Sequence, residues 1–262
     1  MTATRFLNAH LFDPSQSIDG IGYMDIEHGV IKAINLGTPP NDSKIERIID
    51  CKKAVLAPGI IDMRVQSADP GAEHLEPLSD LLSAAGNAGI TQLVSLPATS
   101  PAVDSAVMID SLKLRASNYK GALFHLYGAM TKALENKQMA ELGMMAKAGA
   151  VGFANDLKSV EDSLLMRRIM TYAKMLNKPV IHHCADPYLT NETDMNESET
   201  AIRLGLIGVP AVAETIMLQR DLNLVALTGC RYHAAHISTA SSVEALRRAK
   251  RQGLHVTADT SP

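Results

Sequence analysis

The sequence comprises 262 residues, of which 46% are hydrophobic and 20% are charged, a composition typical of globular proteins. Acidic residues number 28 against 25 lysines and arginines, and tryptophan is absent, so the chain lacks the basic and aromatic surface of nucleic-acid-binding proteins. No apolar run of about 18 residues and no signal-peptide pattern occurs. The three cysteines are scattered without a CxxC pair. We therefore expect a cytoplasmic protein with no nucleic-acid and no membrane partner.

The first part of the chain, residues 1–57, consists of short apolar pieces separated by turn residues. Examples are Val30–Ile34 and Ile45–Ile49, with glycine, proline, asparagine and aspartate between them. Short apolar runs bounded by such residues are typical of strands. This part is predicted to be a small β-rich sandwich module.

From Pro58 to Pro262 short apolar runs alternate with amphipathic segments of helical length. This alternation is typical of βα units and a parallel sheet, and an α/β barrel of the (β/α)8 TIM type is its natural closure. The predicted strands are 60–65, 92–96, 122–126, 150–153, 180–184, 232–237 and 255–258. The barrel needs eight strands, and an open edge after the seventh is unfavourable. We therefore expect an incomplete barrel over residues 58–262 and a natural protein that continues beyond Pro262.

Six helices are predicted between these strands. Their ranges are 78–88, 104–119, 137–148, 161–176, 211–222 and 242–252. The last one has a Ser-x-x-Glu start at Ser241 and Glu244, which is the pattern of a capping box. Ser241 is therefore its predicted N-cap.

Polar residues follow several predicted strands at the carboxyl edge, where barrels of this type carry their catalytic groups. They are Asn155, Asp156, His183, His233, His236 and Asp259. Imidazoles and carboxylates that converge from separate strands are zinc ligands in catalytic sites. These strand-end residues are therefore candidate ligands of a metal ion.

The other histidines have a simpler interpretation. Because side chains alternate across a strand, only one of His182 and His183 can face the barrel interior. A histidine that does not lie at the carboxyl end of a strand is more often a packed or exposed residue than a metal ligand. We interpret four others, His10, His74, His125 and His255, as structural.

The chain resembles the dihydroorotases, a family of cyclic amidohydrolases. The resemblance rests on strings in family order, namely 57–62, 69–76, 96–101, 149–153, 183–186, 213–214, 233–240 and 249–257. The His-x-x-His-x-Ser-Thr string from His233 to Thr239 is the most specific of them. The resemblance implies an amidohydrolase barrel, a small sandwich domain and a hydrolase that uses two metal ions.

The chain departs from the family pattern at several site positions. The family's first strand ends in His-x-His, which supplies two metal ligands, whereas this chain has Arg64-Val65-Gln66. The family's substrate-binding arginine is replaced by Ala68, and its substrate-binding asparagine by Ala98 or Ser100. The degenerate substrate-binding positions are therefore Arg64, Gln66, Ala68, Ala98 and Ser100. The carboxylate expected after the fourth strand falls on Asn155 or Asp156, and the alignment leaves both open.

A guanidinium cannot coordinate a metal and repels one. The family's general base, an aspartate of the eighth strand, lies beyond Pro262, so no catalytic residue is assigned. The resemblance therefore implies one residual zinc ion at most, for which His183, His236 and Asp156 are the candidate ligands, and it favours none.

Three functions remain open, and with them whether the chain is an enzyme. The first is a degenerate dihydroorotase-like pseudoenzyme of pyrimidine biosynthesis, which serves as structural partner of aspartate transcarbamoylase. The second is an active zinc-dependent cyclic amidohydrolase with a reduced metal site. The third is a small-molecule binding protein in which Arg64 pairs with a carboxylate. A homo-oligomer is expected in each case.

Overall fold

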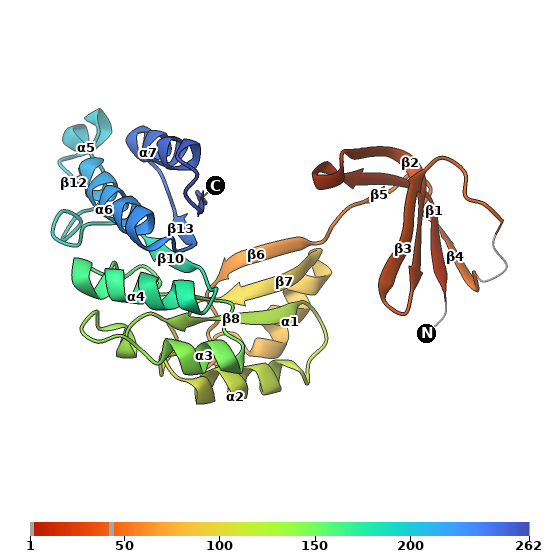
Figure 1. The fold of residues 1–262 in the computed structure, drawn as a ribbon, viewed down its shortest axis with the longest axis horizontal. Helices are drawn as coiled ribbons and strands as arrows, with labels where there is room; N and C mark the ends of the chain where they lie inside the picture. The colour runs from red at the N-terminus through yellow and green to blue at the C-terminus, as the bar shows by residue number, and fades with distance from the viewer. Residues whose placement is uncertain (1–2, 42–44, 262) are drawn as a thin grey trace. The chain divides into compact units, whose positions relative to one another are not determined.

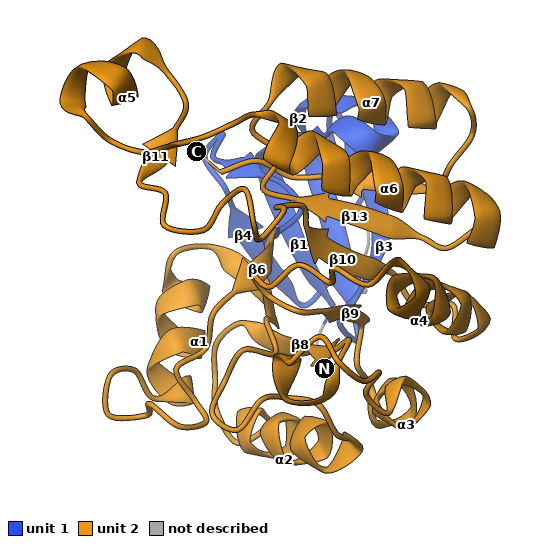
Figure 2. Ribbon diagram, turned by 90° about the vertical axis from the view of Figure 1, so that its left-hand side faces the viewer, with its two compact units in different colours: residues 1–60 blue, residues 61–262 orange. Residues whose placement is uncertain are grey.

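The structure is a computed structural model that describes residues 3–41 and 45–261. The chain divides into two compact units, residues 1–60 and 61–262 (Figure 2). Each is described by itself below. None of the described helices is long and apolar enough to cross a membrane.

The first unit is a five-stranded sheet with the order β3-β2-β1-β4, in which β5 also pairs with β1. Its strands are β1 (Thr4–Asp13), β2 (Ile18–Glu27), β3 (Val30–Leu36), β4 (Arg47–Asp50) and β5 (Val55–Leu56). A short 3-10 helix, η1 (Pro14–Gln16), joins β1 to β2. The β2–β3 turn has positive φ at His28 and Gly29, the conformation that a tight two-residue hairpin requires. The sheet confirms the predicted β-rich module.

One ion pair in this unit shows how an arginine of this protein binds a carboxylate. Arg5 donates from Nε to Asp25 Oδ1 at 2.7 Å and from Nη2 to Oδ2 at 2.8 Å. The two bonds leave the same edge of the guanidinium and run side by side. This is the bidentate geometry that the planar fork of arginine favours.

The second unit contains a seven-stranded sheet with the order β14-β13-β10-β9-β8-β7-β6. Its strands are β6 (Ile60–Val65), β7 (Ile90–Ser95), β8 (Leu123–Ala129), β9 (Gly152–Ala154), β10 (Val180–His183), β13 (Tyr232–Ala235) and β14 (Val256–Ala258). The pairings from β7 to β14 are parallel. The α/β class and the incomplete barrel are confirmed, and the seven strands follow one another in the predicted order. Figure 1 shows β6, β7, β8, β10 and β13 of this sheet.

Helices alternate with these strands. They are α1 (Leu78–Asn87), α2 (Ala106–Ala116), α3 (Leu142–Ala148), α4 (Ser163–Met175), α6 (Val212–Thr228) and α7 (Ala240–Arg251). The segment between β10 and α6 also forms β11 (Met195–Asn196), α5 (Glu199–Leu204) and β12 (Gly208–Val209), which were not predicted. A second 3-10 helix, η2 (Lys132–Leu134), follows β8.

Two helix starts differ from the prediction. Helix α3 begins at Leu142 rather than 137, because Thr131 and Met139 form a β-bridge that holds the preceding residues in a loop. Helix α7 is capped by Thr239, whose Oγ1 accepts a hydrogen bond from the Ser242 N–H. The predicted N-cap, Ser241, is therefore wrong, and it lies inside the first turn.

The sheet separates two apolar layers. The larger layer packs the helices on the outer face of the sheet, and it includes Phe153, Val180 and Tyr232. A smaller cluster covers the inner face and consists of Val94, Leu96, Tyr127, Ala154, Ile181 and Ala235. Side chains alternate between the two faces along each strand. Neighbouring residues of one strand can therefore have different roles, one in packing against the helices and the other on the inner face.

Candidate functional site

His183 and His236 meet at the carboxyl edge of the sheet. His183 ends β10 and His236 follows β13, the neighbouring strand in the sheet. Their Nδ1 atoms are 3.4 Å apart, and their rings are edge to face with centroids 5.3 Å apart. The structure thus brings together two of the three residues that the sequence suggested for a residual ion.

The field at this pair opposes positive charge. Burial lowers the pKa of His183 to about 4, and the charges of His236 and Arg64 act in the same direction. Burial and Arg64 also lower the pKa of His236, although Asp259 and Asp156 oppose this. Both imidazoles are therefore favoured in the neutral form, which is the form that binds metal, and the charge of Arg64 is one contribution that opposes a cation beside them.

One permanent cation, Arg64 in β6, adds to the effect of burial on both pKa values. Its Nε and Nη2 atoms are buried and have no hydrogen-bond partner among residues 3–41 and 45–261. Burial raises the pKa of Tyr127, an inner-face residue, to about 12, and the charge of Arg64 opposes this rise. The guanidinium therefore acts on the inner-face groups that surround the histidine pair.

Asp259, which follows β14, holds part of this arrangement in place. Its Oδ1 accepts the backbone N–H of His236 at 2.6 Å, and its Oδ2 lies 2.9 Å from His233 Nε2. The other ring nitrogen of His233 lies 2.8 Å from Thr257 Oγ1. His236 has a left-handed backbone with φ of 58°, and the bond to Asp259 stabilises it. Both nitrogens of His233 are thus engaged within the protein.

The residues after β9 have separate roles. The Asn155 amide is fully used: its oxygen accepts the N–H groups of Met130 and Thr131, and its Nδ2 donates to Thr131 Oγ1 and Asn136 Oδ1. Asp156, with φ of 58°, is only partly buried, and its charge raises the pKa of His236. Of the two alternatives for a ligand, Asp156 is the one that acts on the histidine pair.

The remaining predicted positions supply little polarity. Gln66 and Ser100 are exposed, whereas Ala68 and Ala98 are partly buried. The loops that follow β6 and β7 touch, since the Ser100 N–H donates to Pro70 O at 3.1 Å. Within the part of the chain that the structure describes, no hydrogen bond joins the Gln66 or Ser100 side chain to the histidine pair. The side chains of Ala68 and Ala98 offer no polar group at these positions.

His182 points away from this site, which agrees with the prediction that only one of His182 and His183 faces the barrel interior. It is 1% exposed and faces α6, where its Nδ1 lies 2.6 Å from Asp221 Oδ2. Its Nε2 accepts the Val160 N–H at 2.9 Å. Since Nε2 is an acceptor, the proton is assigned to Nδ1, which donates to Asp221.

Asp221 is the centre of an outer network that the sequence analysis missed. Tyr232 donates its hydroxyl to Asp221 Oδ2 at 2.7 Å, and Arg220 donates to Oδ1 from Nε at 2.9 Å and Nη2 at 2.7 Å. Burial opposes its ionisation, but His182 and Arg220 lower its pKa overall. The available signal was one carboxylate among the apolar residues of a helix, at Leu218-Gln219-Arg220-Asp221-Leu222.

His182, Cys184 and Asp221 also form a group whose potential ligand atoms lie within 4.8 Å of one another. Their proximity is compatible with one ion. However, both His182 nitrogens and both Asp221 oxygens already have partners. Burial raises the pKa of Cys184 well above its usual value, which favours the thiol over the thiolate that binds metal. The donor set fits a buried hydrogen-bond network better than a metal centre.

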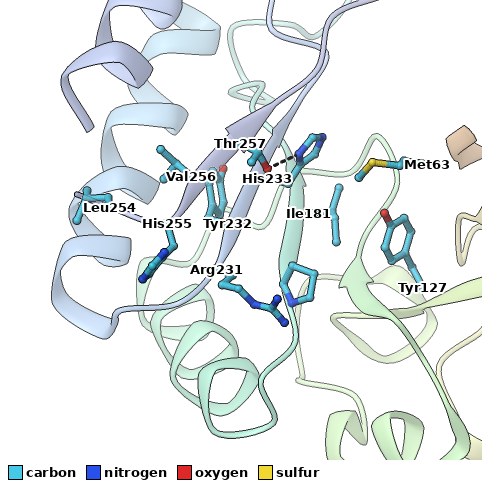
Figure 3. Close-up of a pocket in the computed structure, with 11 residues that line it drawn as sticks. Met63, Tyr127, Ile181, Arg231, Tyr232, His233, Leu254, His255, Val256 and Thr257 are labelled. Carbon is cyan, nitrogen blue, oxygen red and sulfur yellow. Dashed lines mark hydrogen bonds between the residues drawn. The ribbon is translucent and has the colours of Figure 1, made fainter. Parts of the chain in front are cut away.

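A pocket of about 450 Å³ lies beside the inner face (Figure 3). Tyr127, Ile181, His233 and Thr257 contribute to its wall, and the close-up shows the bond between His233 and Thr257. The pocket is open to solvent and has a mixed apolar and polar lining. It also reaches Pro179, Arg231 and His255, so it extends toward the amino ends of β10, β13 and β14 rather than to the histidine pair. A small organic molecule fits a space of this size and lining.

Comparison with known proteins places these features in context. Residues 53–242 match the model of the "Dihydro-orotase-like" family. The chain is 36% identical over 254 residues to a dihydroorotase of Syntrophus aciditrophicus, covering 96% of this chain and 59% of the relative. It is 40% identical over 216 residues to a dihydroorotase of Pelotomaculum thermopropionicum, covering 82% of this chain and 50% of the relative. The chain thus spans about three fifths or less of these relatives.

Solved structures show the same fold. An L-hydantoinase from Arthrobacter aurescens superposes with a TM-score of 0.78 at 22% identity, over 100% of this chain and 59% of the other. A dihydropyrimidinase from Brevibacillus agri gives a TM-score of 0.72 at 20% identity, over 99% of this chain and 57% of the other. The architecture of residues 3–41 and 45–261 is therefore that of part of an amidohydrolase barrel with its β-sheet module.

Proposed function

The chain belongs to the dihydroorotase-like family, and from this premise we propose that it is a non-catalytic protein of pyrimidine biosynthesis. In this proposal it is a pseudoenzyme that acts as a structural partner of aspartate transcarbamoylase. Its cytoplasmic location and its assembly as a homo-oligomer are parts of the same proposal. Relatives named dihydroorotase support the pathway, and the site supports the loss of catalysis.

The observation that carries the proposal is the guanidinium of Arg64. It occupies the first strand, where the family resemblance implies metal-binding histidines, and it disfavours positive charge at His183 and His236. Because arginine stays protonated at all physiological pH values, this repulsion is permanent. The residues present therefore do not fit the metal centre of the family, whose ions activate a water molecule for attack on the cyclic amide.

The partner role is supported by the contrast between the site and the fold. The outer layer keeps a continuous buried core from Val103 to Val256, whereas the inner positions Arg64, Gln66 and Ala68 offer no metal-binding set. A protein that is retained for its surfaces needs a well-packed core, but it does not need a set of metal-binding side chains.

The test uses the full-length protein, purified without chelators. Metal content is measured by elemental analysis, and turnover is measured with carbamoyl aspartate and with dihydroorotate. Assembly with aspartate transcarbamoylase is measured by size-exclusion chromatography with light scattering. We expect substoichiometric zinc, no turnover and a stable complex.

The main alternative is an active zinc-dependent amidohydrolase with a single-ion site at His183, His236 and Asp156. The closeness of the two Nδ1 atoms favours it. It predicts stoichiometric zinc and turnover that a chelator abolishes, and that pair of results would refute the non-catalytic proposal. Two proteins that elute separately at micromolar concentration would refute the partner role alone.

A further inference from the structure

We propose that an arm of the second unit, residues 186–210, docks on the exposed face of α4 in a second copy of this chain. The arm lies between β10 and α6 and contains β11, α5 and β12. The inference assigns the surfaces of the proposed homo-oligomer and therefore rests on that part of the proposed function. It requires neither a metal ion nor aspartate transcarbamoylase.

The arm exposes an unusual number of apolar side chains. Its helix, α5, buries only Ala201, whereas Ile202 is 78% exposed. A concentration of exposed apolar residues on one part of a protein surface marks a place where another molecule binds. The large apolar side chains that the arm exposes are those of Tyr188, Leu189, Ile202, Leu204, Leu206 and Ile207.

The arm is held in shape by its own hydrogen bonds. β11 and β12 pair in parallel, with Met195 opposite Gly208. Ser198 caps α5 by accepting the Ala201 N–H at 3.1 Å, and Gly205 ends the helix with φ of 68°. A surface that is fixed before binding loses less conformational entropy when it docks. The arm therefore presents its apolar side chains in a preformed arrangement.

The arm is also the acidic part of the chain. Its only lysine or arginine is Arg203, and its five carboxylates belong to Asp186, Glu192, Asp194, Glu197 and Glu199. The arm thus has a net charge of −4, and because the whole chain has −3, all other residues together carry +1. No ion pair among residues 3–41 and 45–261 involves these five carboxylates. A surface that complements the arm is therefore basic and partly apolar.

Helix α4 has such a surface. Its exposed residues recur three or four positions apart, which places them on one face of the helix. Arg167, Arg168 and Lys174 lie on this face, and the apolar Leu164 and Met175 lie at its two ends. The helix contains no acidic residue, and its three cations form no ion pair in the part of the chain that the structure describes. This face matches the arm both in charge and in its exposed apolar residues.

The two surfaces lie apart within one chain. α4 packs against α3 and α6, and α6 lies between α4 and α5 in both views (Figures 1 and 2). In a two-fold pair of copies each arm meets the α4 of the other copy, so the same interface forms twice. The opposite charges favour this arrangement over contacts of arm with arm or of α4 with α4.

Analytical ultracentrifugation of the full-length protein, without transcarbamoylase, measures the dissociation constant of the dimer. The arm variant, Glu197→Lys with Glu199→Lys, reverses two charges of the arm. The helix variant, Arg167→Glu with Arg168→Glu, reverses two charges of α4. Asp110→Lys, at an exposed position of α2, is the matched charge control. Circular dichroism reports whether each variant is folded.

We expect each charge-reversed variant alone to raise the dissociation constant roughly ten- to a hundredfold, because like charges then face each other. An equimolar mixture of the two variants should recover the dimer, because each reversed surface then meets its opposite in both interfaces. Asp110→Lys should dimerise as the wild type does.

A second pair of variants tests the apolar contact without changing any charge. Ile202→Ser should weaken the dimer about tenfold or more, because it truncates an apolar anchor of the interface. Val107→Ser is the matched control, since Val107 is a similarly exposed residue of α2, and it should leave the dissociation constant unchanged. This pair keeps the test decisive if the arm variant fails to fold.

Three results would overturn the inference. They are a wild type that stays monomeric at about 100 μM, an arm variant that dimerises as well as Asp110→Lys, and a mixture of the two charge-reversed variants that recovers no dimer. Arm variants that keep the dimer but lose the complex with aspartate transcarbamoylase would also overturn it, since the arm would then bind that protein. Failure of the partner role is a separate result, because the dimer is measured with no transcarbamoylase present.

Discussion

Replacement of Asp221 by asparagine is the sharpest test of the outer network. Asp221 is 0% exposed and accepts hydrogen bonds from His182, Tyr232 and Arg220. An amide has one oxygen, so it can serve Arg220 or the His182 and Tyr232 side, but not both. Breaking a buried charged pair by removing one partner costs about 3–5 kcal/mol, and we expect Asp221→Asn to lose a free energy of unfolding of that size.

Urea denaturation followed by circular dichroism measures this loss as a lower midpoint. Tyr232→Phe is the matched control, because it removes a single hydroxyl and should cost about 1–2 kcal/mol. If Asp221→Asn lost no more than this control, the network would not stabilise the fold as argued.

The same substitution predicts a pH dependence. The pKa of Asp221 is lowered in the folded protein from an ordinary value of 3.8. Its ionised form therefore contributes stability that is fully present above that value and is lost as the pH falls through the lower folded-state pKa. The difference in unfolding free energy between wild type and Asp221→Asn should be constant from about pH 6 to 8 and shrink below about pH 4. A difference that grew on acidification would contradict the assignment.

Three further predictions concern metal and capping. The double variant Arg64→His with Gln66→His should bind more zinc than the wild type, because it removes a cation and adds two ligands. Elemental analysis measures the zinc content, and an unchanged value would mean that Arg64 is not the group that opposes the ion. Addition of EDTA should leave the thermal unfolding midpoint of the wild type unchanged, since the His182, Cys184 and Asp221 group is satisfied by hydrogen bonds; a fall of several degrees would show a structural metal. Thr239→Ala should cost about 1 kcal/mol as the loss of an N-cap, and more than Ser241→Ala; the reverse order in urea denaturation would restore Ser241 as the cap.

The sequence was sufficient for the order of the seven strands of the parallel sheet and of the six helices between them, but not for β11, α5 and β12. Hydrophobic runs bounded by glycine and proline mark the β-strands, and their alternation with amphipathic segments marks the βα units. The opposite facing of His182 and His183 also followed from strand geometry alone. These features are local, so a single sequence contains them.

Other features depend on contacts between distant residues, which a single sequence does not reveal. The start of α3 depends on a bridge between Thr131 and Met139, and the cap of α7 depends on which of several neighbouring hydroxyls the backbone turns toward Ser242 N–H. The identity of Arg64 was visible in the sequence. The burial of its Nε and Nη2 atoms without acceptors could not be predicted, because burial depends on residues far along the chain.

His182 and His183 are adjacent in the chain, but they take part in two separate parts of the structure. His182 belongs to the bonding that attaches α6 to β10, whereas His183 belongs to the inner face. A polar inner-face position such as His183 can therefore change without breaking the hydrogen bonds between α6 and β10. Conversely, a substitution at Asp221 would break hydrogen bonds that hold α6 against the sheet, whether or not the inner face has a chemical role.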